Sequence, residues 1–184
     1  MLAPRHKVFV SYHHANDEAY RNAFEKIFAD RHDILVPKSV QIGDIDPNLP
    51  TERVRQIIRE EYLHDSTVIV VLIGSQTWQR KHVDWEIGSS IRQTALNTRS
   101  GLLGILLPTY PFPSPSRNTY DPNTIPPRLY DNLQNNYATI HLWNTDPSVV
   151  SEWIDAAFRR RTSMLPNNSR LSFGNNRSGP RWQE

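Results

Sequence analysis

The stretch STVIVVLIG, residues 66–74, decides the fold class. A strand built from it is apolar on both faces, which is typical of a central strand in a parallel sheet covered on both sides. Predicted strands and helices alternate along the rest of the chain. Further strands are expected at residues 6–12, at the start of 33–50, at 101–107 and at 137–143. The order predicts an α/β fold whose parallel sheet is flanked by helices on both faces, with right-handed crossovers.

Apolar residues at helical spacing predict helices after the first three strands and after the last strand, with no helix expected between the strands at 101–107 and 137–143. Asn16 and Thr51 are the expected N-caps of the first two helices, since both side chains accept backbone hydrogen bonds at helix starts. The third helix is expected over residues 77–93 and the last over 146–161. The Pro-rich stretch 108–127 is too long for an ordinary connection, so it is expected to be a lid, a docking surface or an ordered decoration.

Composition excludes several classes of protein. The chain of 184 residues has no Cys, which excludes disulfides, thiol nucleophiles and thiolate metal sites. Its longest apolar run, Val68–Ile73, is too short to span a bilayer, and residues 1–7 lack the apolar stretch of a signal peptide. A cytoplasmic protein is therefore expected.

The charge is unevenly distributed. The net charge is +2, yet from Arg159 onward there are six Arg against Glu184 alone, so the preceding part is mildly acidic. The composition predicts one domain over residues 1–161 and a basic, flexible tail over 162–184. The alternative for the tail is an arm that binds nucleic acid or an acidic partner.

The third helix carries a carboxylate at an unusual position. At 100° per residue, Val83, Ile87 and Ile91 face the core, and Glu86 lies about 60° to one side of Val83, on the flank of His82. A carboxylate on such a boundary can face a cleft. The alternative is an ordinary flanking residue paired with Arg80, Lys81 or Arg92.

Three segments in order and spacing resemble the Toll/interleukin-1 receptor (TIR) domain, and more closely the ThsB-type TIR-like proteins of Thoeris anti-phage systems. They are VFVSY (8–12), DSTVIVVLIGS (65–75) and SQTWQRKHVDWEI (75–87), within a likeness that covers residues 7–160. The resemblance implies a flavodoxin-like sheet of about five parallel strands. It also implies an enzyme that breaks the bond between nicotinamide and ribose in NAD⁺.

The resemblance assigns Glu86 as the catalytic residue. The family pattern of aromatic, small residue, two variable positions, Glu and aliphatic residue reads here as His82 to Ile87, with His82 where Trp is usual. In TIR domains the nucleotide cleft opens at the end of the first strand. The expected substrate-binding residues there are Ser11, Tyr12, His13 and Asp17, which are alternatively only a polar loop and a helix cap.

Other candidates belong to neighbouring loops. Asp44 and Asp46, in the loop QIGDID that gates the site in TIR domains, are expected either to bind substrate or to form a turn. Trp78 is expected either to line the cleft or to pack against the sheet. No metal site is expected, because the neighbouring side chains of His13 and His14 diverge and no third ligand is specified.

The favoured function is therefore NAD⁺ cleavage without a cofactor, NAD⁺ being the substrate. The product is expected to be a cyclic ADP-ribose isomer or a conjugate with a small acceptor such as histidine, which activates a separate effector protein. Active TIR sites are often completed between subunits, so a homo-oligomer is also implied. The alternatives are a non-catalytic TIR-like module that acts by assembly, and a nucleic-acid-binding or nuclease-type protein led by the Arg-rich tail.

Overall fold

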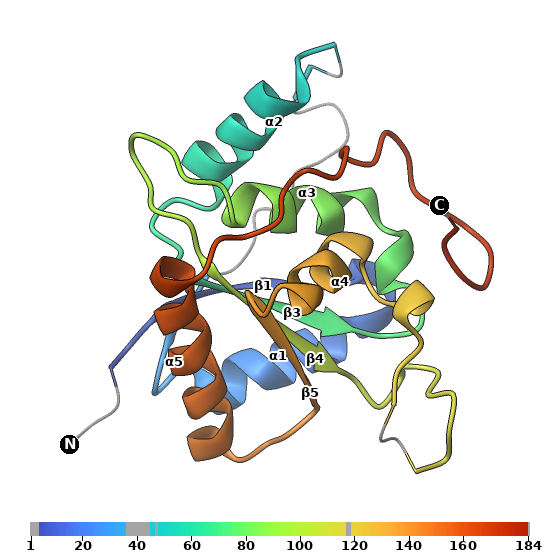
Figure 1. Cartoon of the computed structure of the whole chain (residues 1–184). Helices are drawn as coiled ribbons and strands as arrows, with labels where there is room; N and C mark the ends of the chain where they lie inside the picture. The colour runs from blue at the N-terminus through green and yellow to red at the C-terminus, as the bar shows by residue number, and fades with distance from the viewer. Residues whose placement is uncertain (1–3, 36–44, 47, 117–118, 184) are drawn as a thin grey trace.

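The computed structural model describes residues 4–35, 45–46, 48–116 and 119–183. Five parallel strands form one sheet in the order β2-β1-β3-β4-β5 (Figure 1). This is the order of the flavodoxin-like doubly wound fold, whose direction of winding reverses between β1 and β3. The strands are β1 (Lys7–Ser11), β2 (Asp33–Leu35), β3 (Val68–Ile73), β4 (Gly101–Leu106) and β5 (Ala138–Leu142).

Helices cover both faces of the sheet, so the predicted fold class is confirmed (Figure 1). The longer helices are α1 (His14–Phe28), α2 (Thr51–Ile57), α3 (Lys81–Ser90), α4 (Pro127–Gln134) and α5 (Pro147–Ser163). A π-helix, η1 (Ile58–Tyr62), continues α2, and short 3₁₀ helices form η2 (Thr77–Gln79) and η3 (Pro122–Thr124). None of the helices described is long and apolar enough to cross a membrane.

Strand β3 shows why the sheet has two covered faces. Its residues are all fully buried, and alternate residues enter different apolar clusters. Ile69, Val71 and Ile73 pack with side chains of α3 and α4, whereas Val68, Val70 and Leu72 pack with side chains of α1 and α5. The continuous apolar run of this strand thus reflects its central place between two helical layers.

Two predicted N-caps and the predicted continuity of the third helix are wrong. His13, not Asn16, is the N-cap of α1, and its Nδ1 lies 3.2 Å from the backbone N of Asn16. Pro50 precedes α2 where Thr51 was the expected cap. The third helix is interrupted, because η2 is separated from α3 by the extended residue Arg80.

The Pro-rich stretch is more regular than expected. It contains η3, and α4 begins at its last residue, Pro127, a placement that suits the fixed backbone angle of proline in a first helical turn. The Tyr110 side chain is buried, and its hydroxyl lies 2.6 Å from that of Thr124. The stretch therefore contains a helix start and a buried anchor.

A flexible tail was expected over residues 162–184, but the C-terminal segment after α5, residues 164–183, lies along α3 and α4 (Figure 1). The indole N–H of Trp85 donates to the carbonyl of Phe173 (2.8 Å), and the side chain of Phe173 is itself buried. Basic residues of the C-terminal segment also form ion pairs with acidic residues, as Arg170 does with Asp131 at 2.7 Å. Both kinds of contact join residues far apart in the chain, which a local pattern does not reveal.

Candidate functional site

The buried carboxyl group of Glu86 lies beside the end of β1. Glu86 is 2% exposed, and the hydroxyl of Ser11, the last residue of β1, donates a hydrogen bond to its Oε2. The winding of the sheet reverses between β1 and β3, which is where doubly wound folds bind ligands. Glu86 and Ser11, both predicted site residues, are therefore in direct contact at this position.

Burial sets the charge of this carboxyl group. Removal from water raises the pKa of Glu86 to about 8, and the hydrogen bond from Ser11 opposes the rise only in part. The free protein consequently holds Glu86 mostly protonated at neutral pH. Ionisation requires a compensating positive charge or additional hydrogen-bond donors.

Three aromatic rings line this part of the site. The ring of His14 lies 4.6 Å from that of Tyr12 and 4.6 Å from that of His82. The Nε2 of His82 lies 3.0 Å from the carbonyl O of Tyr12, so it carries the hydrogen and donates it. Burial lowers the pKa of His82 to about 4, and His82 is therefore neutral at pH 7. The predicted residues Tyr12 and His82 are thus joined, with His14 packed beside both.

His14 was not among the predicted site residues. The expectation that His13 and His14 diverge holds: His13 caps α1 and has Nε2 2.7 Å from Arg80 Nε, whereas His14 reaches the ring of His82. One possible ligand atom each of His14, His82 and Glu86 lies within 4.8 Å of the others. The structure thus places two possible metal ligands, His82 and Glu86, beside His14, which the adjacent pair His13 and His14 does not suggest.

Asp17 lies deeper than a capping residue. It is 1% exposed, and Oδ1 accepts a hydrogen bond from the Thr109 hydroxyl at 3.0 Å, while Oδ2 has no hydrogen-bond partner among the described residues. Burial raises the pKa of Asp17. A Cβ atom on Gly74 would lie 2.3 Å from Oδ2, so the carboxyl group occupies the space that glycine leaves after β3. Its described contacts are with the loops after β3 and β4.

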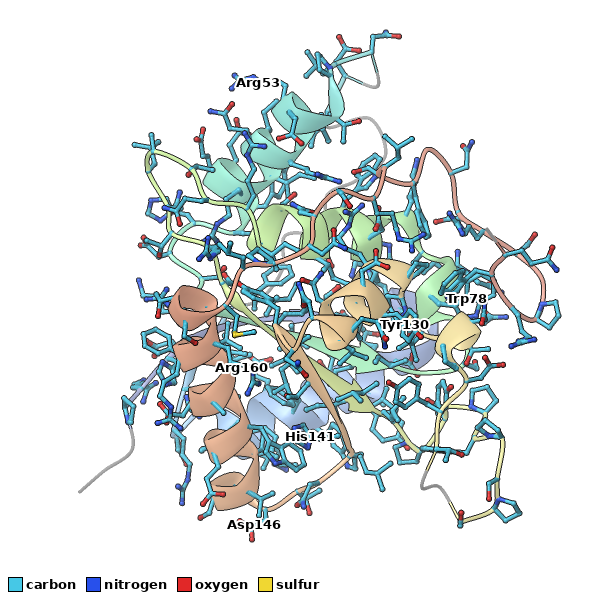
Figure 2. The ribbon with its side chains drawn as sticks, in the orientation of Figure 1. Arg53, Trp78, Tyr130, His141, Asp146 and Arg160 are labelled. Carbon is cyan, nitrogen blue, oxygen red and sulfur yellow. The ribbon has the colours of Figure 1, made fainter. Side chains whose placement is uncertain are left out.

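The remaining predicted site residues are Asp44, Asp46 and Trp78. Asp44 is outside the described residues, and Asp46 is exposed, where its carboxylate accepts a hydrogen bond from the backbone N–H of Asn48 (2.9 Å). Trp78 is 2% exposed and lines a pocket with residues 177–183 of the C-terminal segment (Figure 2). The geometry of Asp46 fits the turn alternative.

A buried ion pair holds the other side of α3. Asp84 accepts hydrogen bonds from Arg128 of α4 at 2.9 and 3.3 Å, and its Oδ2 also accepts the backbone N–H of Phe173 at 2.9 Å. Both charged side chains are almost fully buried. This network fixes the helix that carries Glu86 between α4 and the C-terminal segment. Sequence reasoning missed it because the three partners are more than 40 residues apart.

The sequence also matches one family model. Residues 9–111, more than half of the chain, match the model described as Thoeris protein ThsB, TIR-like domain. The matched range contains Ser11, Tyr12, His14, His82 and Glu86, whereas Arg128 and the C-terminal segment lie outside it. No curated protein matches the chain. Matched sequence and parallel five-stranded sheet together show that the chain belongs to the family of Thoeris ThsB proteins with a TIR-like domain.

Proposed function

We propose that this protein of anti-phage defence cleaves NAD⁺ between nicotinamide and ribose and makes an ADP-ribose-derived signal for a separate effector protein. The observation that carries the proposal is the Glu86 carboxyl group, buried against Ser11 at the point where the winding of the sheet reverses. Family membership supports the role in defence.

One carboxyl group is enough for this reaction. Nicotinamide is a pyridinium cation in NAD⁺ and leaves as a neutral molecule, so no general acid has to protonate it, unlike the leaving group of an ordinary glycoside. The barrier lies in the positive charge that develops on the ribose. Ionised Glu86, hydrogen-bonded to the ribose hydroxyls, would stabilise that charge in a site from which water is largely excluded.

Burial makes Glu86 sensitive to its ligand. The free protein holds a neutral carboxyl group, because ionisation is unfavourable without a nearby positive charge. The pyridinium of NAD⁺ brings a positive charge and so lowers the pKa of Glu86 when it binds. The ionised Glu86 carboxylate then stabilises the positive charge that develops on the ribose in the transition state. Differential stabilisation of this kind accelerates the chemical step rather than only tightening binding.

The nucleophile determines the product. Water gives ADP-ribose, a second atom of the same nucleotide gives a cyclic isomer, and an external imidazole or amine gives a conjugate. We propose a cyclic ADP-ribose isomer or a histidine-type conjugate. Glu86 is only 2% exposed, and a site from which water is largely excluded favours a positioned nucleophile over hydrolysis.

The test is to incubate the wild-type protein and Glu86→Gln with NAD⁺ and follow the products by mass spectrometry. Free histidine is included as an acceptor, and lysate from phage-infected cells as a source of activator. Wild type should release nicotinamide, and Glu86→Gln should be slower on the order of 10²–10³-fold. Glu152→Gln, at an exposed position of α5, is the matched control and should behave as wild type.

Two results would contradict the proposal. Equal rates for wild type and Glu86→Gln would remove Glu86 from the chemistry. Absence of NAD⁺ consumption in all conditions, together with phage protection by cells that carry Glu86→Gln, would favour a module that acts by assembly.

A further inference from the structure

Two potential metal ligands lie on one face of α3. His82 and Glu86 are four residues apart in this helix, so their side chains lie on the same face, separated by about one helical turn. The third, His14, is the first residue of α1, and its ring lies 4.6 Å from that of His82. One ligand atom from each of the three residues lies within 4.8 Å of the others.

Two imidazoles and one carboxylate are a donor set that Zn²⁺ takes, with a fourth position left open. At metal–ligand distances of about 2.0–2.1 Å, tetrahedral coordination requires donor atoms roughly 3.3 Å apart. The donor atoms of His14, His82 and Glu86 therefore have to approach one another by at most about 1.5 Å. Rotation of side chains about their χ angles covers such a distance without moving the backbone.

Two of the three residues, His82 and Glu86, already make hydrogen bonds of the kind that metal ligands make to their surroundings. His82 donates its Nε2–H to the carbonyl of Tyr12 (3.0 Å), which leaves Nδ1 with the lone pair that a metal requires. Glu86 receives the Ser11 hydroxyl on Oε2. Backbone carbonyls that accept from a ligating histidine, and hydrogen bonds to a ligating carboxylate, are the usual outer partners of metal sites.

We propose that His14, His82 and Glu86 form a Zn²⁺ site, and that the bound ion blocks NAD⁺ cleavage because Glu86 cannot serve the metal and the ribose together. The binding stands on the geometry alone, whereas the blocking rests on the proposed function. The metal site is restricted to family members with a histidine at the position of His82, because the Trp that is usual there provides no ligand.

Binding is tested on full-length protein without a histidine affinity tag, stripped with EDTA and dialysed. Isothermal titration with ZnCl₂ should show one ion per chain, and Co²⁺ should give the visible absorption of a low-symmetry nitrogen and oxygen site. His14→Gln, His82→Gln and Glu86→Gln should each weaken Zn²⁺ binding by at least about 10-fold. His64→Gln is the control, because His64 is a solvent-exposed histidine 3.0 Å from Asp65 and is a ready surface ligand. Thermal unfolding confirms that each variant is folded.

The outcomes separate the two parts of the proposal. Wild-type affinity in all three site variants, loss of binding in His64→Gln, or no binding at all would overturn the metal site. With an active preparation, Zn²⁺ should suppress nicotinamide release and EDTA should restore it. Binding to these residues with unchanged activity would overturn the blocking role. A protein that binds Zn²⁺ at this site but never cleaves NAD⁺ would instead contradict the proposed function.

Discussion

Replacing Glu86 by Gln should stabilise the fold at neutral pH. Gln keeps the shape of the side chain and an oxygen that accepts the Ser11 hydroxyl, but it cannot ionise. The pKa of Glu86 is raised from 4.5 to about 8, so between these values the folded state binds more protons than the unfolded state. The free energy of unfolding of the wild type therefore falls as pH rises through this window and is level above it.

The magnitude follows from the two pKa values. About 2.5 pH units separate 4.5 from pH 7, and each pH unit costs about 1.4 kcal/mol, so ionisable Glu86 lowers the stability of the wild type at pH 7 by about 3–4 kcal/mol. Urea denaturation of the wild type and Glu86→Gln from pH 4.5 to 9, with EDTA present, measures this difference. The advantage of Glu86→Gln should grow up to pH 8 and then stay constant.

Glu152→Gln provides the comparison, because Glu152 is exposed and its replacement should leave the pH dependence of the wild type unchanged. Parallel stability curves for wild type and Glu86→Gln would refute the reasoning. They would mean that the carboxyl group of Glu86 ionises in the folded protein as easily as in the unfolded chain.

Three further predictions concern pH and the buried polar groups. The kcat/KM of the wild type for NAD⁺ should rise with pH up to about 8, since the ionised form of Glu86 is the active one; a profile that is flat from pH 6 to 9 in nicotinamide release would contradict this. Burial lowers the pKa of His32 to about 4, so stability should be lost as pH falls from 6.5 to 4, and His32→Gln should show a weaker loss in urea denaturation over that range. Arg128→Ala leaves Asp84 buried without its charged partner and should cost about 3–5 kcal/mol of stability, with faster proteolysis of the C-terminal segment as a second readout.

The sequence allowed the sheet to be predicted because its signals are local. Residues 66–74 are apolar on both faces, and this pattern alone places β3 at the centre. The position of Glu86 at the edge of the core-facing side of the third helix was predicted in the same way, because helical spacing separates Glu86 from Val83 and Ile87. Periodicity could not show that Glu86 is fully buried, because its cover at the end of β1 is 75 residues away.

The features that were missed depend on distant partners or on unusual local chemistry. The start of α4 was hidden in a Pro-rich stretch, although proline is well suited to a first helical turn. The docking of the C-terminal segment uses single anchors such as Phe173 and side-chain hydrogen bonds, which have no period. The approach of His14 to His82 required knowing that α1 and α3 begin side by side. For a metal site formed by these residues, the sequence offered one signal, the four-residue spacing of His82 and Glu86.

The contact between Trp85 and Phe173 has a consequence for synthesis of the protein. These residues are 88 positions apart, so at about 5–20 residues per second the ribosome adds the partner of Trp85 roughly 4–18 s after Trp85 itself. Throughout that interval the outer side of α3 lacks its cover, and the charge of Asp84 lacks the Phe173 amide. The helix that carries Glu86 therefore acquires its complete environment late in translation, after the five strands of the sheet have been made.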